Sequence, residues 1–222
     1  MTWKALVRGE HLEPPPWAYA RMARGSLMRL IYRLFVGDLT TAVPLNTRLL
    51  DVGTGPGYLL GYLSTARPDL SLWGVDFADD MIRRAKPRQA AVLAPQTPVR
   101  WLVADACSLP FPESAFDQVV ATFSFHIWPC PVAGLQELRR VLAPGGRAWV
   151  YELRREASLP DLKAFARAMN LPFLLVYLGF KIVSRHHAVP APEFAHALRQ
   201  AAQDCGTLRP VHHIFWRAEL AG

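Results

Sequence analysis

Three glycines at alternate positions form the stretch of this chain most suited to binding a ligand. Gly53, Gly55 and Gly57 lie in LDVGTGPG, directly after an apolar run and one acid, Asp51. Glycine lets the backbone approach a ligand closely, and a helix that begins after the loop offers unpaired N–H groups. A dinucleotide-binding loop would place its third glycine one residue later, and a carboxylate at position 51 would repel a pyrophosphate. The spacing therefore favours a ligand with an ammonium group, and the alternative is a tight structural turn.

Two further acids end the next two apolar runs. Asp76 follows SLWGV and Asp105 follows VRWLVA. A carboxylate at the end of a buried strand can accept hydrogen bonds from both ribose hydroxyls, and one at the next strand can accept from an adenine amine. The structural alternatives are an N-cap at Asp76, although Asp79 is better placed for that cap, and a turn-forming role for Asp105. Together with Asp51, the acids suit the amino acid, ribose and adenine parts of one ligand.

The elements that would position these residues alternate between strands and helices. The predicted strands cover residues 48–53, 71–77, 99–105, 116–125 and 147–153. Helical patterns begin at Gly57 and near Asp79, and a third covers residues 131–142. Such alternation indicates βαβ units and a parallel sheet covered on both faces, with ligands bound at the carboxyl ends of the strands.

The flanking segments have a different pattern. A helix is predicted over residues 17–37, with Gly37 as its stop, and a largely apolar helical stretch over 158–189. An amphipathic helix over 192–206 precedes a last β-like segment, residues 207–220.

The composition is that of a globular protein, with 222 residues of which 51% are hydrophobic and 19% charged. The net charge of +7 suggests a nucleic acid or an anionic membrane as partner, but the basic residues are widely spread, which favours a scattered solvated surface. Cys107, Cys130 and Cys205 have neither disulfide-framework nor zinc-site spacing, so we expect no metal. With no secretory signal and no apolar run long enough to span a bilayer, we expect a cytoplasmic protein.

Taken together, these motifs resemble the class I S-adenosylmethionine-dependent methyltransferases, especially the small-molecule branch of ubiquinone and menaquinone biosynthesis. The resemblance covers about residues 45–153 and rests on LLDVGTGPGYL, GVDFADDMIRRAK, VADACSLPF, FDQVVATFSFHIW and RVLAPGGRAWVYEL. It implies an α/β fold: a Rossmann-like, doubly wound, mostly parallel sheet of seven strands, the last of them antiparallel. Residues 207–220 are short for the final hairpin of that family, so we expect truncated or irregular closing strands. It also implies one domain, whose parts are a helical cap (1–45), a cofactor-binding core (46–153), a helical cap insertion (154–189) and a C-terminal helix with a closing strand (190–222).

The resemblance further implies which residues hold S-adenosylmethionine, with S-adenosylhomocysteine as the product. Asp76 is the ribose ligand and Met81 packs near the adenine, while Tyr19 and Tyr32 can close over the methionine end or simply pack. The full implied set is Asp51, Gly53, Thr54, Gly55, Pro56, Gly57, Asp76, Phe77, Met81, Asp105, Ala106, Cys107, Phe123 and Tyr19.

The acceptor side of the reaction is less defined by the sequence. A base is needed only when the acceptor must lose a proton, and His126 in FSFHIW is the candidate, the alternative being a structural histidine. The apolar face of the first helix and residues 171–180 favour a pocket for a hydrophobic or aromatic small molecule, or a patch that contacts a membrane, unless the two segments bury each other.

We therefore expect an enzyme that methylates a small hydrophobic or aromatic acceptor. An RNA-directed methyltransferase is the alternative suggested by the charge, but the fourth strand is not followed by the Asn/Asp-Pro-Pro-aromatic motif of base-amine methylation. A non-catalytic S-adenosylmethionine-binding protein is the third possibility.

Overall fold

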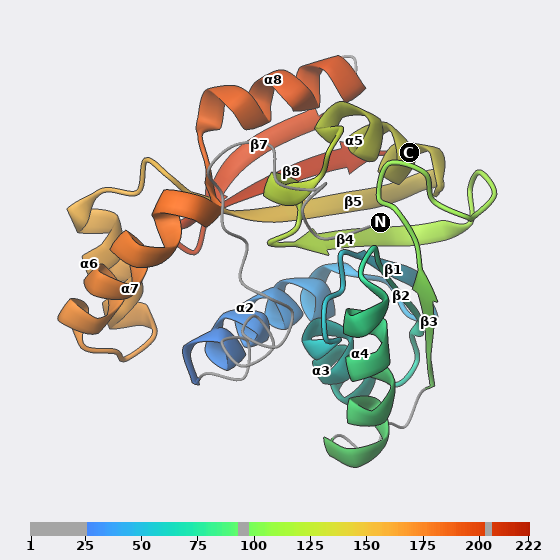
Figure 1. Cartoon of the computed structure of the whole chain (residues 1–222), viewed down its shortest axis with the longest axis horizontal. Coiled ribbons are helices and arrows are strands. Elements are labelled where there is room, and N and C mark those ends of the chain that lie inside the picture. The colour runs from blue at the N-terminus through green and yellow to red at the C-terminus, as the bar shows by residue number, and fades with distance from the viewer. Residues whose placement is uncertain (1–25, 93–97, 203–205) are drawn as a thin grey trace.

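The computed structural model describes residues 26–92, 98–202 and 206–222, and its centre is one twisted sheet (Figure 1). The strands follow the order β3-β2-β1-β4-β5-β8-β7, and a short strand, β6, also pairs with β5. Strands β1 to β5 are parallel, whereas β8 is antiparallel to both β5 and β7. This order confirms the mostly parallel doubly wound sheet and its antiparallel last strand. The strands are β1 (Arg48–Val52), β2 (Ser71–Asp76), β3 (Val99–Val103), β4 (Phe116–Thr122), β5 (Leu142–Arg154), β6 (Ala188–Val189), β7 (Gly206–Val211) and β8 (Phe215–Ala221).

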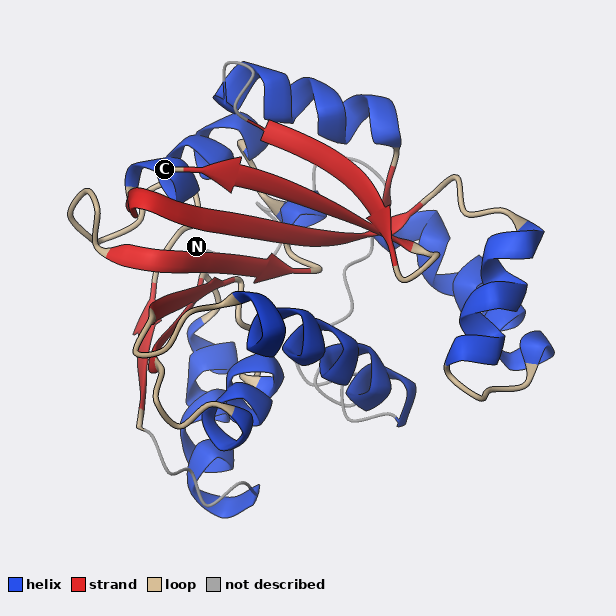
Figure 2. Ribbon diagram, turned by 180° about the vertical axis from the view of Figure 1, so that it is seen from behind, coloured by secondary structure: helices blue, strands red, loops and turns tan. Residues whose placement is uncertain are grey.

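Helices cover both faces of the sheet, as the view from behind also shows (Figure 2). Neighbouring residues of β1 explain this: Leu49 packs with the helices of one face, and Leu50 with those of the other, because successive side chains of a strand point to opposite sides. Helices α2 and α3 cover the first face and α5 and α8 the second. The described helices are α2 (Ser26–Ala42), α3 (Tyr58–Ala66), α4 (Asp79–Val92), η2 (Phe125–Ile127), α5 (Pro131–Arg140), α6 (Leu159–Ala168), α7 (Phe173–His187) and α8 (Ala191–Ala202).

Helix α2 does not stop at Gly37, so that prediction is wrong. The helix continues to Ala42 because Phe35 and Leu39 are fully buried on the sheet side. Tertiary burial of this kind outweighs the weak preference of one glycine, about 1 kcal/mol. The first part of the predicted helix, residues 17–25, lies outside the described residues.

A polar cluster fixes α2 to the sheet. Asp38 accepts hydrogen bonds from the Tyr151 hydroxyl at 2.9 Å and from the ring of His212 at 3.0 Å, and Arg217 lies 3.4 Å away. Burial raises the pKa of Asp38, but the hydrogen bond from His212 and the other partners outweigh it and hold that pKa below its usual 3.8. The cluster joins α2 to β5, β8 and the turn between β7 and β8.

The last segment of the chain is a complete hairpin, not a truncated one. β7 and β8 pair from Gly206↔Leu220 to Val211↔Phe215, around a turn in which His212 and His213 both have positive φ. One sequence run, 207–220, concealed the hairpin because its turn contains neither Gly nor Asn-Gly, the usual turn signals.

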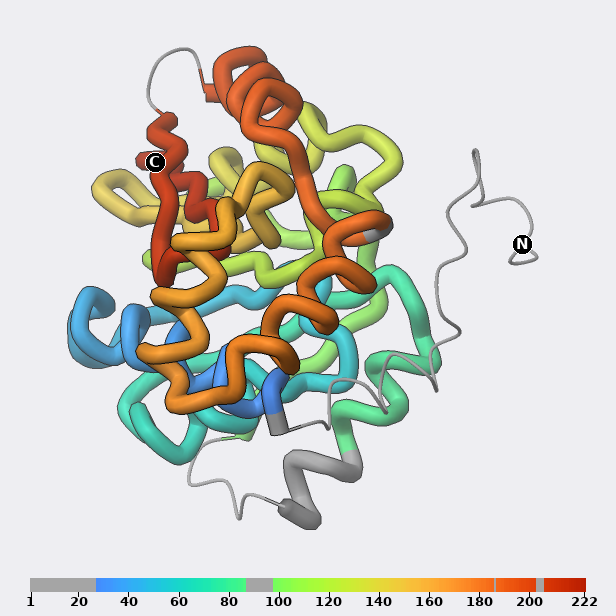
Figure 3. Tube along the Cα trace, turned by 90° about the vertical axis from the view of Figure 1, so that its left-hand side faces the viewer, coloured from blue at the N-terminus to red at the C-terminus, as the bar shows by residue number. Residues whose placement is uncertain are grey.

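Helices α6 and α7 form a hairpin that stands out from the end of β5 (Figure 1), and Figure 3 looks onto this hairpin, drawn in orange, from outside. Ser158 begins α6 with a capping box, in which its hydroxyl accepts from the Asp161 backbone and the Asp161 carboxylate accepts from the Ser158 backbone at 2.8 Å. This hairpin is the helical insertion expected after the fifth strand.

Candidate functional site

The glycine loop is held against the end of β2 by its own backbone. The N–H groups of Gly53 and Thr54 both donate to the carbonyl of Val75 at 2.9 Å. The N–H of Gly55 donates to the Asp76 carboxylate at 2.8 Å. The first loop and the second acid are therefore in direct contact, as the parallel sheet requires.

All three glycines have the positive φ that other residues rarely adopt: 72° at Gly53, 55° at Gly55 and 77° at Gly57. A Cβ at Gly53 would overlap the side chain of Ser124, and one at Gly57 would lie 2.6 Å from the ring of Trp101. At these two positions the protein's own packing takes the space. The glycines thus form the tight turn that was given above as the alternative to ligand binding. This turn also shapes the edge of the sheet on which a ligand can lie.

Asp51 is the most unusual group at this edge. Its side chain is fully buried and its Oδ2 accepts a hydrogen bond from the Thr54 hydroxyl at 2.6 Å, but Oδ1 has no partner among the described residues. Burial raises the pKa of Asp51 to about 7, and the nearby Asp76 carboxylate adds to the effect. A buried carboxylate with one unsatisfied oxygen suits a positively charged group on a ligand, because such a group would offset the cost of burying the charge.

Asp76 also supports the turn that follows it. Its Oδ1 accepts from the Ala78 backbone at 2.9 Å, while Asp79, the first residue of α4, pairs with Arg83. The prediction that Asp79 takes the capping role is therefore wrong. Burial raises the pKa of Asp76. Each of its carboxylate oxygens keeps a further lone pair that can accept a hydrogen bond from a hydroxyl group.

The end of β3 has a similar arrangement. Oδ1 of Asp105 accepts from the Cys107 backbone at 2.8 Å, which is the turn-forming role given above as the alternative. The Cys107 thiol donates to the carbonyl of Cys130 at 3.3 Å, and Ala106 is buried. Burial raises the pKa of that thiol, so it is held as a neutral group.

The remaining predicted cofactor residues divide into two groups. Pro56 is buried in the glycine loop, Phe77 is 55% exposed beside Asp76, and Met81 is buried in the first turn of α4. Phe123 follows β4 and packs on Phe35 and Phe215, in the hydrophobic cluster that contains α2. Tyr19 lies outside the described residues, and Tyr32 is buried and stacks on Tyr58.

Phe123 and His126 line an apolar cavity of about 110 Å³ between α2 and α7. The two apolar segments identified in the sequence both contribute to one hydrophobic cluster, and residues of both line the cavity. Its other lining residues are Leu27, Met28, Ile31, Leu153, Phe165, Val176, Gly179, Phe180, Val183, His187, Ile214 and Phe215.

A chain of three titratable side chains lies at the wall of this cavity. Nδ1 of His126 is 3.1 Å from Oε2 of Glu152, and Nε2 of His126 is 3.0 Å from Nδ1 of His187. Glu152 is fully buried in β5, whereas His187 comes from the last turn of α7. The chain therefore connects the sheet to the helical insertion through η2.

Comparison with known proteins gives a consistent result. A family model described as a methyltransferase domain matches residues 50–150. The chain is 37% identical over 167 residues to a demethylmenaquinone methyltransferase of Thermus thermophilus, with 70% of this chain and 73% of that protein covered. A second relative of the same name, from Deinococcus radiodurans, is 36% identical over 111 residues, which are 50% of this chain but only 45% of that protein.

The chain belongs to the S-adenosylmethionine-dependent methyltransferase family. A solved structure described as a putative member of this family, from Methanococcus maripaludis, superposes with a TM-score of 0.70 over 97% of each chain. Its identity of 17% means that it shows the fold alone. S-adenosylmethionine is therefore the methyl donor of this methyltransferase and S-adenosylhomocysteine the product.

The residues at the carboxyl ends of β1 and β2 fit this cofactor. The unsatisfied oxygen of Asp51 suits its ammonium group, and the spare lone pairs of Asp76 suit its ribose hydroxyls. When bound, the cofactor supplies an activated methyl group, so the methyltransferase itself has to position the acceptor, exclude water and remove a proton where one must leave.

Three residues of the site were missed by sequence reasoning: Ser124, Glu152 and His187. Glu152 had a signal, since it is one acid inside the apolar strand AWVYEL. His187 ends the RHH run of residues 185–187, where neither an acid nor a cysteine lies nearby in the sequence to indicate a partner. Ser124 had no signal, because its contact with the backbone of Val52 joins residues far apart in the sequence.

Proposed function

We propose that this methyltransferase methylates a lipophilic aromatic acceptor of the quinol class, bound in the cavity between α2 and α7. The observation that carries the proposal is an apolar cavity whose wall includes two hydrogen-bonded histidines, backed by the buried Glu152. A volume of about 110 Å³ is of the order of the ~150 Å³ cavity that holds a benzene ring, so one aromatic ring is the size that fits. The Thermus relative, named for demethylmenaquinone, supports the same chemical class.

A short segment after β4 connects this cavity to the cofactor edge. Ser124 occupies the space beside Gly53 in the cofactor loop, while its neighbours Phe123 and His126 line the cavity. The acceptor and the methyl donor would therefore bind in adjacent sites that meet at residues 123–126, close enough for direct methyl transfer. In this proposal α6 and α7, within residues 154–189, are the acceptor-binding cap.

The hydrogen-bond chain suggests how a proton leaves the acceptor. When Nδ1 of His126 carries the hydrogen and donates it to the Glu152 carboxyl group, Nε2 of His126 accepts from Nδ1 of His187. In this tautomer the basic nitrogen of the pair is Nε2 of His187. We therefore assign the base to the His126–His187 pair, with Glu152 stabilising the positive charge that develops.

The acceptor class is tested by supplying labelled S-adenosylmethionine with a panel of short-chain quinols, simple phenols, and bulk tRNA and rRNA. We expect label in the quinols. Transfer to RNA alone would overturn the proposal and favour an RNA-directed enzyme.

The role of the histidine pair is tested separately. His126→Gln and His187→Gln should lower kcat about 10²- to 10⁴-fold and flatten the acidic limb of its pH profile, because the proton acceptor is lost. His196→Gln, which changes an exposed histidine of α8, is the matched control and should have wild-type kinetics. If both cavity variants keep wild-type kcat, neither histidine is part of the base.

A further inference from the structure

Helix α7 is apolar on two opposite faces. One face lines the cavity, and the other is solvent-exposed: Leu174 is 64% exposed and Ile182 71%. Leu174, Leu178 and Ile182 recur every four residues, so they form one row about 12 Å long. We call this row, together with Leu175, the outer stripe; its residues are Leu174, Leu175, Leu178 and Ile182.

An outward apolar row of this kind is not explained by the fold. Val176, Phe180 and Val183, on the opposite side of the helix, already pack α7 against the hydrophobic core. Contiguous exposed apolar side chains of this kind, bordered by polar residues, mark a surface that contacts a protein, a ligand or a membrane. The outer stripe therefore requires a partner surface.

The charges around the stripe indicate which partner that is. The segment of α7, FLLVYLGFKIVSRHH, contains no acid, and Lys181 and Arg185 project from the helical positions adjacent to the stripe. The nearby acids are already engaged: Asp161 caps α6 and pairs with Arg154, and Glu156 accepts from the Ala191 backbone. Among the described residues, neither of the two cations has a carboxylate partner, so the field on this side is positive.

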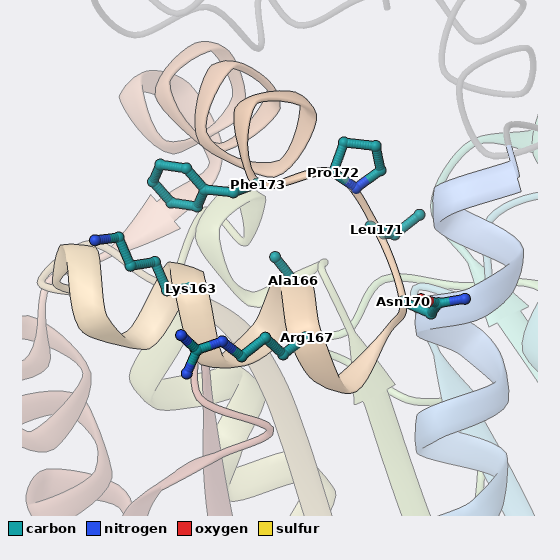
Figure 4. A pocket seen from close by; sticks show the side chains of 7 residues that line it. All are labelled: Lys163, Ala166, Arg167, Asn170, Leu171, Pro172 and Phe173. Atoms are coloured by element: carbon teal, nitrogen blue, oxygen red, sulfur yellow. The ribbon is translucent and has the colours of Figure 1, made fainter.

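The elbow between α6 and α7 adds a second cationic feature. It is hollowed, with a volume of about 640 Å³, and Lys163 and Arg167 line it together with Asn170 (Figure 4). In the same view Phe173 and Pro172 border the hollow. Apolar rings and two cations around one open hollow match the chemistry of a lipid with an anionic headgroup.

We propose that the α6–α7 hairpin docks this methyltransferase on an anionic lipid surface, with the outer stripe at the boundary between headgroups and acyl chains. Lys163, Arg167, Lys181 and Arg185 would then contact the phosphates. α7 has 15 residues, about 22 Å, and among the described residues no helix is long and apolar enough to cross a membrane, so the hairpin lies on the surface. Resting on the proposed function, this arrangement lets a lipophilic acceptor pass from the bilayer to the cavity under α7.

The test is co-sedimentation of the full chain with vesicles of phosphatidylcholine alone or with one-third phosphatidylglycerol. We expect binding that needs the anionic lipid and weakens with salt. The triple variant Leu174→Ser, Leu178→Ser, Ile182→Ser and the double variant Lys163→Glu, Lys181→Glu should each bind at least tenfold more weakly. Leu45→Ser, which removes a leucine 76% exposed in the turn after α2, is the matched control and should bind like the wild type.

Three results would overturn the proposal. The first is no wild-type binding, or equal binding to both vesicle types. The second is wild-type binding by the triple variant. The third is a concentration-dependent dimer of the wild type that the triple variant abolishes, since this would mean that a second copy of the chain covers the stripe. Calorimetry with S-adenosylmethionine and turnover of a water-soluble quinol are measured in parallel, so a failure of the proposed function is distinguishable from a failure of docking.

Discussion

The buried carboxylate of Asp51 makes a quantitative prediction about stability. Its pKa is about 7 in the folded protein, against an ordinary value of 3.8 in the unfolded chain. Between these two values the folded state binds more protons than the unfolded state, so the free energy of unfolding falls as the pH rises. At about 1.36 kcal/mol per pKa unit, the full penalty above pH 7 is of the order of 4 kcal/mol, of which about 2–3 kcal/mol develops between pH 5 and pH 8.

Asp51→Asn removes this titration while it keeps the shape of the side chain. The amide oxygen can still accept from the Thr54 hydroxyl, but its NH₂ replaces an oxygen that has no partner among the described residues, which costs about 1–3 kcal/mol at every pH. The sign of the difference at one pH is therefore not decisive. The change of this difference with pH is decisive: from pH 5 to pH 8 the free energy of unfolding of the Asn variant should rise by about 2–3 kcal/mol relative to that of the wild type.

Urea unfolding at pH 5, 6, 7 and 8 measures this change. Asp117→Asn is the matched control, because the hydrogen bond from Arg48 holds the pKa of Asp117 below its usual value and the group is ionised throughout this range. If the free energies of unfolding of Asp51→Asn and the wild type differ by the same amount at every pH from 5 to 8, burial does not raise the pKa of Asp51. Stabilisation by S-adenosylmethionine should also grow with pH over the same interval, because its ammonium group favours the ionised carboxylate.

Three further variants test other parts of the molecule. Gly53→Ala should lose at least about 2 kcal/mol of stability in urea unfolding, from its positive φ and the overlap with Ser124, and adding Ser124→Gly should recover only the overlap. Asp38→Asn should lose about 2–4 kcal/mol at pH 7, where wild-type Asp38 is ionised, and this difference should shrink as the pH falls through and below 3.8, since the folded pKa is lowered. Gly179→Leu, at a position whose added Cβ meets no atom within 4 Å, should fill the cavity and raise the KM for the acceptor at least tenfold without changing the unfolding temperature by more than a few degrees.

Much of the fold was predictable because its signals are local. Apolar runs gave β1 to β4 within about three residues, and the glycine loop gave the first turn, since both depend on neighbours in the sequence. β5 begins at Leu142, ahead of the predicted 147–153, because the Pro-Gly-Gly segment read as a turn continues the strand. Gly37 was misread because the burial of Phe35 and Leu39, which carries α2 past it, depends on strands far along the chain. The closing hairpin was missed because two histidines with positive φ replace the usual turn residues.

The candidate site was predictable only where the local sequence around one residue shows where that residue lies in the fold. Acids at strand ends are such residues, and Asp51 and Asp76 lie together at one edge as the alternation implied. The chain of Glu152, His126 and His187 could not be derived in this way, because its members come from β5, η2 and α7 and meet only when the hairpin packs on the sheet. One sequence shows residue types, whereas this contact depends on tertiary packing.

The central claim is that the cofactor and a lipophilic aromatic acceptor bind in two distinct, adjacent sites that meet at residues 123–126. The most direct measurement is steady-state methyl transfer to a short-chain quinol, with both substrates varied, for the wild type, Asp76→Ala and Gly179→Leu. We expect Asp76→Ala to raise the KM for S-adenosylmethionine and leave that for the quinol near wild type, and Gly179→Leu to do the reverse. A Gly179→Leu enzyme with wild-type quinol KM and weakened S-adenosylmethionine binding would contradict the account.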